Sequence, residues 1–177
     1  MYRHVNHKCE IEVLTVEQVA IYHYKEQENF INGIHCEGAL MVTIFFTLFW
    51  DIIYSVDIPD VFISKLQYLP LDFYYDDFYE NRKNTICTRL DEIKTEWSLD
   101  YMETYIVDTW DNVSTKKSLI SPFIVNDGEE LYQIILCIGR AVVSDICKRL
   151  AENFRRHNSG MPDLFVWNDS QVMKLKK

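Results

Sequence analysis

The sequence lacks any apolar run long enough to cross a membrane. Its most apolar stretch, Leu40–Trp50, is about half of the roughly 20 residues that a spanning helix needs, and Asp51 ends it. The first residues, Met1–Cys9, are polar, which argues against a signal peptide. Internal repeats and low-complexity linkers are missing as well. We therefore expect the 177 residues to form a globular protein with a proper core.

An excess of positive charge is also missing. The net charge of −9 argues against a nucleic-acid-binding surface that extends over the whole chain. The total hides an asymmetry, because residues 140–177 contain eight Lys or Arg against four Asp or Glu, whereas residues 1–139 contain ten against twenty-three. The C-terminal part of the chain is therefore its basic part.

A disulfide framework is not expected, because the cysteines are odd in number and scattered. They are Cys9, Cys36, Cys87, Cys137 and Cys147. Three of them fall in apolar helical patterns, which is typical of reduced core thiols in a cytosolic or nuclear protein. His4, His7 and Cys9 have zinc-ligand chemistry, but no second half of a four-ligand site follows at a usual distance. For Met1–Cys9 we favour a frayed terminus.

Capping signals and apolar periodicity predict a run of helices. Thr15–Gln18 is a capping box that opens a helix reaching about Asn29, with Val16 on its apolar face. The further helices expected are 39–54, 76–96, 98–110, 129–138 and 140–156. In helix 76–96 the core face is expected to hold Phe78, Ile86, Leu90 and Ile93, and the solvated charged face Glu80, Arg82, Lys83, Arg89, Asp91 and Glu92.

The C-terminal segment Gly160–Asn168 predicts a strand that follows a turn. Proline lacks an N–H and suits the first residue of a strand, so Asp163, which follows Pro162, would lie at the start of the strand. Asn168–Ser170 is typical of a turn, and Val172–Leu175 predicts a return strand. Helices followed by a β-hairpin indicate an α+β fold whose sheet is incomplete.

Two carboxylates and two arginines are the candidate site residues, and each has an ordinary alternative. Asp163 is positioned to hold a divalent metal, or it caps a loop before a strand. Glu37 is either a second metal ligand or an acid that complements the dipole of helix 39–54. Arg155 and Arg156 lie shortly before Asp163, where a phosphate would be held, or they complement the dipole at a helix end.

Six collinear stretches covering nearly the whole chain resemble the C-terminal part of the Fanconi-associated nuclease family. The catalytic module of that family is the VRR-NUC branch of the PD-(D/E)xK nuclease superfamily. The matching stretches are Val13–Glu17, Gly33–Gly38, Leu48–Ile53, Ile58–Phe62, Pro70–Phe73 and Gly160–Asn168. A single stretch of this kind would be a weak signal, whereas six in order are a specific one.

The resemblance implies a nuclear DNA-repair enzyme that acts on interstrand cross-links. It implies 5′ flap endonuclease and 5′→3′ exonuclease activity with Mg²⁺ or Mn²⁺, on branched DNA and alongside repair proteins. By this resemblance Glu37 and Asp163 are catalytic and metal-binding carboxylates, and Arg155, with Arg156 beside it, lies near a DNA phosphate. Residues 1–95 would be a helical region that packs on the nuclease core, and residues 96–177 the VRR-NUC domain with a restriction-endonuclease-like hairpin.

One departure from the family concerns the second strand of the hairpin. The superfamily carries Glu-x-Lys there, whereas this chain reads Met173–Lys177 and places Lys177 where the glutamate belongs. The expectation is therefore a chain truncated before that strand, which binds divalent metal more weakly than a complete site. The alternative function is a non-catalytic nuclear fragment that binds DNA or protein.

Overall fold

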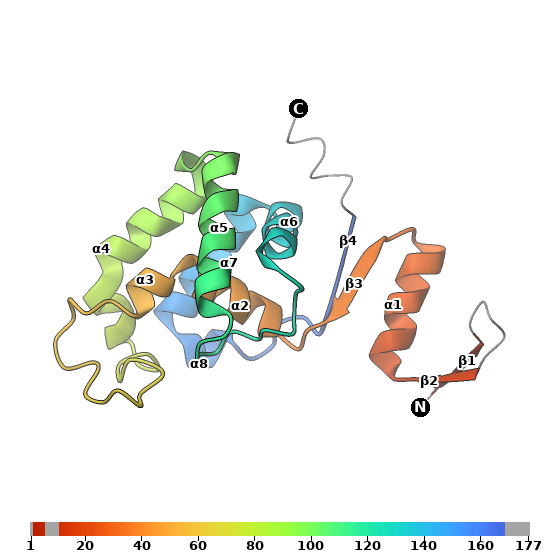
Figure 1. The fold of residues 1–177 in the computed structure, drawn as a ribbon, viewed down its shortest axis with the longest axis horizontal. Coiled ribbons are helices and arrows are strands. Elements are labelled where there is room, and N and C mark those ends of the chain that lie inside the picture. The colour runs from red at the N-terminus through yellow and green to blue at the C-terminus, as the bar shows by residue number, and fades with distance from the viewer. Residues whose placement is uncertain (1, 6–10, 169–177) are drawn as a thin grey trace. The chain divides into compact units, whose positions relative to one another are not determined.

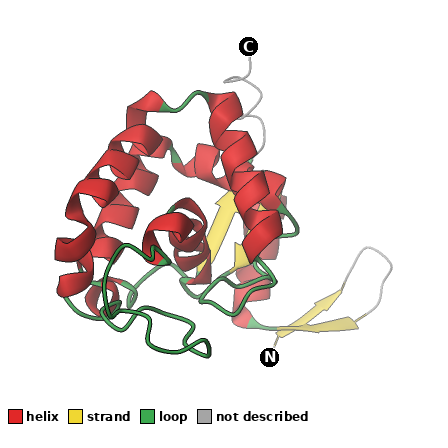
Figure 2. Ribbon diagram, turned by 60° about the vertical axis from the view of Figure 1, so that its left-hand side comes forward, coloured by secondary structure: helices red, strands yellow, loops and turns green. Residues whose placement is uncertain are grey.

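The computed structural model describes residues 2–5 and 11–168 (Figure 1). The chain divides into two compact units, one formed by Met1–Glu37 with Pro162–Lys177 and the other by Gly38–Met161. The described strands belong to the first unit and the second is helical, so the predicted α+β class is confirmed (Figure 2). The predicted domain boundary after residue 95 falls inside the second unit. Among the described residues, every helix is too short or too polar to cross a bilayer.

The first unit combines one helix with two antiparallel strand pairs. Its elements are β1 (Tyr2–Val5), β2 (Ile11–Leu14), α1 (Val16–Gln27), β3 (Asn32–His35) and β4 (Leu164–Trp167). β1 pairs with β2, and β3 pairs with β4. The expectation of a frayed N-terminus is wrong for β1, which lies in a strand pair, while His7 and Cys9 lie outside the described residues.

The capping box at the start of α1 forms as predicted. The Thr15 hydroxyl accepts from the Gln18 amide at 3.3 Å, and the Gln18 side chain accepts from the Thr15 amide at 2.9 Å. These two bonds satisfy amides that have no partner inside the helix. The predicted apolar face, however, is not buried, since α1 has no buried residue and Val16 is 59% exposed.

The second unit is built from helices. They are α2 (Ala39–Leu48), α3 (Trp50–Ile53), α4 (Asp77–Asp91), the π-helix η1 (Glu92–Glu96), α5 (Leu99–Val113), α6 (Gly128–Ile138), α7 (Arg140–Glu152) and α8 (Phe154–His157). Two expected long helices are each divided, the first at Phe49 and the second at Asn153, where the backbone leaves the helical region. The Asn153 side chain caps α8 by accepting from the Arg156 amide at 3.0 Å.

Helix α2 forms the centre of the core. A helix that is apolar all round must be covered on every side, and α2 is buried from Leu40 to Leu48. Phe45 and Phe46 both lie within 6.5 Å of Phe154, measured between ring centroids. Before α2, Gly38 takes a left-handed conformation (φ 78°), and a Cβ there would lie 3.0 Å from the Cβ of Met161. Only glycine suits that position.

The described cysteines, which are Cys36, Cys87, Cys137 and Cys147, are not joined by disulfides. Cys36 and Cys147 are buried, whereas Cys87 is exposed. Burial raises the pKa of Cys147, so this thiol stays protonated at neutral pH. Of the three cysteines in helical patterns, Cys147 is in the core as predicted, whereas Cys137 is half-buried and Cys87 is exposed.

Two arginines of α4 that were expected on a solvated face are buried instead. The Arg82 side chain donates to Asp72 at 2.7 Å and to the carbonyl of Ile52 at 3.2 Å, and the residue is 3% exposed. The Arg89 side chain is 11% exposed and bonds to Asp51 at 2.8 Å. A guanidinium presents five donors in a fixed fork, so it can be buried where carbonyls and carboxylates meet it.

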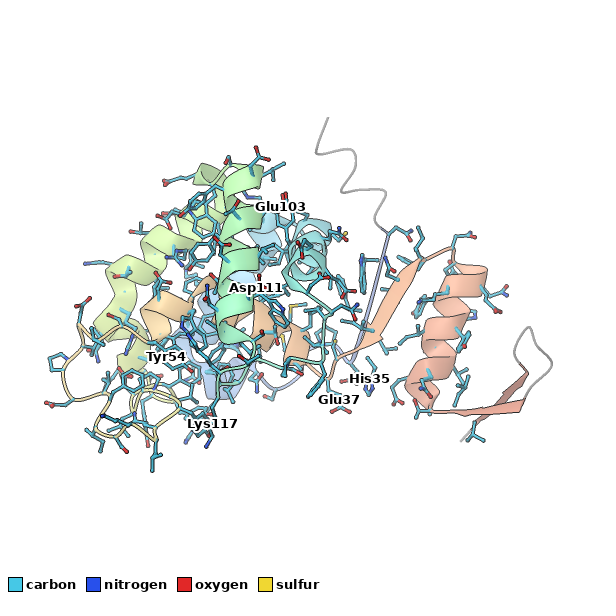
Figure 3. The ribbon with its side chains drawn as sticks, in the orientation of Figure 1. His35, Glu37, Tyr54, Glu103, Asp111 and Lys117 are labelled. Carbon is cyan, nitrogen blue, oxygen red and sulfur yellow. The ribbon has the colours of Figure 1, made fainter. Side chains whose placement is uncertain are left out.

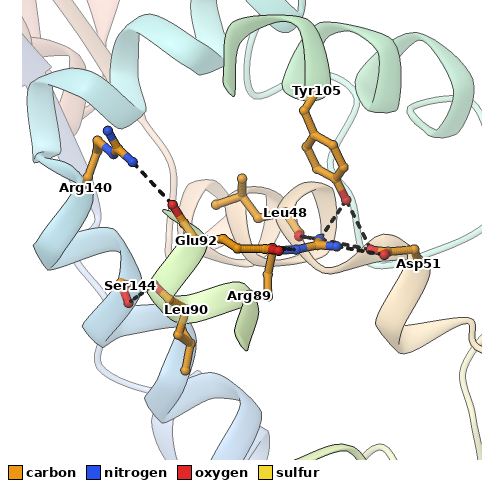
Figure 4. Close-up of polar contacts among 8 residues, drawn as sticks. All are labelled: Leu48, Asp51, Arg89, Leu90, Glu92, Tyr105, Arg140 and Ser144. Carbon is orange, nitrogen blue, oxygen red and sulfur yellow. Dashed lines mark hydrogen bonds and ion pairs between the residues drawn. The ribbon is translucent and has the colours of Figure 1, made fainter. Parts of the chain in front are cut away.

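The π-helix η1 follows α4 directly, and side chains of α7 donate to carbonyls around this junction. Arg140 donates to the carbonyl of Ile93 at 2.6 Å and to that of Glu92 at 3.3 Å. Ser144 donates to the carbonyl of Leu90 at 3.1 Å (Figure 4). A π-turn changes the hydrogen-bond ladder of a helix, and these two side chains of α7 supply donors at that point.

Candidate functional site

The strand pair β3–β4 brings Glu37 and Asp163 to the same edge of the first unit. His35, the last residue of β3, is paired with Leu164, the first residue of β4. The residues that follow β3 therefore lie beside the residues that precede β4. The Cys36 amide donates to the Asp163 carbonyl at 2.8 Å, and the Glu37 amide lies 3.4 Å from the same oxygen. Two acidic residues that are remote in sequence therefore have adjoining backbones.

Glu37 lies just before α2 in an unusual backbone conformation. Its φ is 41°, in the left-handed region that non-glycine residues adopt at a cost on the order of 1 kcal/mol. The N-cap of α2 is Gly38, and the Glu37 side chain is 77% exposed. Asp163 is exposed as well. Both acids thus present their oxygens to solvent, as a ligand site requires.

A histidine adjoins one of the two carboxylates. The Nε2 atom of His35 lies 3.5 Å from Oε1 of Glu37 (Figure 3). Residues two apart in an extended segment share a face, so the spacing His35-x-Glu37 could have indicated this contact, which the sequence analysis missed. A nitrogen donor beside a carboxylate restricts the orientation of that carboxylate.

The first turn of α1 carries a further acid near this histidine. The pKa of Glu17 lies below its ordinary value because the carboxylate accepts from its own amide and from Thr15, with a smaller attraction from His35. Glu17 therefore remains charged to lower pH than a free glutamate. It adds negative charge to the electrostatic environment of His35.

The chemistry of the two carboxylates fits a hard divalent cation in type. Such ions take oxygen ligands, and Mg²⁺ takes about six, usually including several waters. Among the described residues, no group of three or more His, Cys, Asp or Glu side chains gathers into a metal site. Glu37 and Asp163 thus offer two of the oxygen ligands. The predicted return strand, with Lys177, lies outside the described residues.

Arg155 and Arg156 lie in α8, which belongs to the second unit. The guanidinium carbon of Arg155 is 5.3 Å from the ring centroid of Tyr74 and 5.6 Å from that of Tyr75. These rings hold the exposed guanidinium by cation–π contact. The two carboxylates belong to the first unit, so the participation of both arginines in one site with them stays a prediction.

Comparison with known families gives the class of protein. Residues 101–176 match the VRR-NUC domain, within the region 96–177 predicted for it. The chain is 34% identical to human Fanconi-associated nuclease 1 over 155 residues, which are 87% of this chain and 15% of the relative. The zebrafish (Danio rerio) protein is 33% identical over 160 residues, which are 88% of this chain and 16% of that relative. The Schizosaccharomyces pombe homolog is 35% identical over 159 residues, which are 89% of this chain and 22% of that relative.

A solved structure agrees with this relationship. The crystal structure of paFAN1 bound to 2nt 5′ flap DNA with gap matches with a TM-score of 0.70 and 26% identity, covering 90% of this chain and 28% of that chain. Residues 101–176 thus resemble a VRR-NUC domain. Over most of its own length the chain is similar to Fanconi-associated nuclease 1 in sequence and in fold. It spans between 14% and 22% of the length of the curated relatives that it matches.

Proposed function

We propose that the chain is the metal-binding part of a structure-selective DNA nuclease that hydrolyses phosphodiester bonds. The observation that carries this proposal is the convergence of Glu37 and Asp163, whose backbones meet at the Asp163 carbonyl. The match of residues 101–176 to the VRR-NUC domain supports it independently. The proposed nuclease domain comprises residues 96–177, with Glu37 supplied by the region 1–95.

In the proposed mechanism Glu37 and Asp163 hold Mg²⁺ or Mn²⁺ through their carboxylate oxygens. When bound, the ion neutralises charge on the scissile phosphate and makes a water molecule nucleophilic at neutral pH. His35 orients the Glu37 carboxylate by the 3.5 Å contact between them. Arg155 and Arg156 contact a DNA phosphate and offset the repulsion between acidic residues and DNA.

The proposed substrate is branched DNA with a 5′ flap, and the proposed activities are 5′ flap endonuclease and 5′→3′ exonuclease. The flap substrate in this proposal is supported by the similar proteins, which are Fanconi-associated nucleases and a paFAN1 bound to 5′ flap DNA. We further propose that the protein acts in the nucleus, in interstrand cross-link repair and with other repair proteins.

A second candidate function is binding without cleavage. Glu37 and Asp163 offer two ligands, and the described residues contain no larger metal-binding group, so water or DNA would have to supply the other oxygen ligands of the ion. A chain with this site would bind DNA through its arginines and leave hydrolysis to a complete site.

Cleavage of a 5′ flap substrate in Mg²⁺ or Mn²⁺ separates the two functions. We expect Glu37→Gln and Asp163→Asn each to reduce cleavage by at least about 100-fold, the scale of losing one preorganised electrostatic group. Glu28→Gln is the matched control, because Glu28 is an exposed acid of the same unit. If the unsubstituted chain binds the substrate but does not cleave it, the binding function is correct. If all variants cleave equally, the proposed site is wrong.

A further inference from the structure

Three aromatic rings of the second unit form a continuous stack. Trp50 and Tyr54 are one helical turn apart, with ring centroids separated by 4.1 Å and planes inclined by 32°. Tyr54 and Phe62 follow at 5.9 Å and 24°. All three side chains are half-buried rather than enclosed in the core. We call Trp50, Tyr54 and Phe62 the aromatic ladder.

A cavity of about 460 Å³ adjoins the ladder. Its lining residues are Tyr54, Val56, Ile58, Pro59, Asp60, Phe62, Ser64, Lys65 and Gln67. This volume lies in the range of about 300–1,000 Å³ found for pockets that enclose small ligands. Two ladder rings form part of the wall, so a planar group in the cavity can lie against an aromatic surface.

The loop that carries the cavity is held in shape by hydrogen bonds. The Gln67 side chain donates to the carbonyls of Val61 and Leu69 at 2.6 Å each. The Leu71 amide donates to the Val61 carbonyl at 2.9 Å. On this braced loop Val56 and Leu66 are 89% and 87% exposed. The braced loop thus leaves these two apolar side chains open to solvent and to a ligand.

Three lysines border the ladder and its cavity. Lys65 lines the cavity and is exposed. The ammonium of Lys116 lies 5.8 Å from the centroid of the Trp50 ring, and that of Lys117 lies 5.3 Å from the Tyr68 ring. Tyr54 donates to the Tyr68 carbonyl at 2.8 Å, which joins the ladder to the ring under Lys117. Tyr54 and Lys117 accordingly lie in the same part of the unit (Figure 3).

We propose that the aromatic ladder and its lysines bind unpaired nucleotides of a single-stranded nucleic acid. Proteins bind single strands by stacking bases on aromatic side chains beside a track of positive charge. A base in the cavity would stack on Phe62 and extend the ladder, while Lys65, Lys116 and Lys117 face the phosphates. The choice of nucleic acid as ligand rests on the proposed function, whose branched substrate contains an unpaired strand.

Charge predicts that stacking dominates this binding. Asp57 and Asp60 lie on the same loop as Lys65, so the three lysines leave only a small local excess of positive charge. Each neutralised phosphate of a single strand contributes about −0.7 to the slope of log K against log salt. We therefore expect a shallow slope, no steeper than about −2.

The test is fluorescence anisotropy of the full chain with a labelled ten-nucleotide oligothymidine in EDTA. We expect Phe62→Leu, which keeps an apolar side chain but removes the ring, to weaken binding by about fivefold or more, as for the loss of one stacked base. Phe123→Leu is the matched control, since Phe123 is 94% exposed outside the ladder. Lys65→Ala should weaken binding by about twofold to fivefold. Its control is Lys94→Ala, which should leave binding unchanged because Lys94 is paired with Asp145.

An abasic oligonucleotide of the same length distinguishes bases from phosphates. We expect it to bind at least about tenfold more weakly than oligothymidine, because it retains charge and loses the stacking groups. Thermal melting of Phe62→Leu checks that the variant is folded, and the exposed Lys65→Ala gives a second test if it is not. The proposal is wrong if the unsubstituted chain does not bind, if Phe62→Leu and Phe123→Leu bind alike, or if the abasic strand binds equally.

This test is independent of the proposed catalysis. EDTA removes divalent ions, so binding here does not involve Glu37 or Asp163. A chain that cleaves DNA but fails these binding tests would lack the stacking site and keep its nuclease function. A chain that passes them but never cleaves would keep the stacking site as part of a non-catalytic binder.

Discussion

The Cys36 amide donates a 2.8 Å hydrogen bond to the backbone carbonyl of Asp163. This bond lies just outside the β3–β4 pair and continues its register towards the two acids. Because the contact uses the Asp163 backbone, the carboxylate is not needed for it. Substitutions of the Asp163 and Glu37 side chains therefore test ligand chemistry without disturbing the strands, since both side chains are exposed.

The arginines of α8 should contribute to DNA binding through phosphate contact. We expect Arg155→Gln and Arg156→Gln each to weaken the binding of duplex or flap DNA and to reduce the salt slope by about 1. Anisotropy titrations between low and moderate salt in EDTA measure both quantities. Lys94→Gln is the control, because Lys94 is an exposed cation of the same unit that lies 3.8 Å from Asp145. If the control reduces the slope as much, no specific phosphate contact exists.

Arg89 should be a major contributor to the stability of the second unit. It donates to Asp51, to Tyr105 at 2.8 Å and to the carbonyl of Leu48 at 2.6 Å, and it bonds to Glu92 at 3.0 Å (Figure 4). We expect Arg89→Met to reduce the free energy of unfolding by about 2–3 kcal/mol, because it removes a buried guanidinium and leaves its acceptors unpaired. The corresponding fall in Tm is about 5–10 °C.

A surface ion pair provides the contrast for Arg89. Lys83 and Glu80 are 3.5 Å apart, with side chains 54% and 63% exposed. We expect Lys83→Met to change the free energy of unfolding by less than about 0.5 kcal/mol, because water screens the pair. Equal effects of Arg89→Met and Lys83→Met on Tm would contradict the burial of Arg89.

The same network predicts a dependence of stability on pH. Burial alone would raise the pKa of Asp51, but hydrogen bonds and attraction from Arg89 hold it below the ordinary value of 3.8. A depressed pKa in the folded state stabilises the fold above the unfolded pKa, and this contribution is lost as pH falls through the folded value. We therefore expect Asp51→Asn to lose less stability than the unsubstituted chain between pH 6 and pH 3 in urea titrations. A steeper loss in Asp51→Asn would contradict this sign.

Local signals in the sequence predicted much of the fold. The Thr15 capping box lies where the sequence placed it. The helix expected from residue 98 begins there as well, with the Ser98 hydroxyl accepting from the Tyr101 amide at 3.2 Å. These features depend on residues three positions apart, so a short segment contains all the information. The strand after Asp163 was predicted in the same way, from proline and a β-forming run.

Features that depend on distant partners could not be predicted in this way. β3 is only four residues long and pairs with β4 at the other end of the chain, so its own residues did not predict a strand. Arg89 belongs to a charge pattern typical of a solvated face, and its burial depends on Asp51 and Tyr105. In α7, which was expected from apolar periodicity, the apolar residue Val142 is 51% exposed. Whether a helix face is covered depends on tertiary contacts with elements that are distant in sequence.

Titration of the chain with Mn²⁺ by calorimetry tests most directly whether Glu37 and Asp163 form a divalent-metal pair. We expect one weak site, with affinity reduced by at least about tenfold in Glu37→Gln and in Asp163→Asn, because each removes one carboxylate ligand. Glu28→Gln should leave the affinity unchanged, and unaltered melting temperatures should show that all variants are folded. Tight Mn²⁺ binding that survives Asp163→Asn, or an equal loss in Glu28→Gln, would contradict the assignment of this metal site.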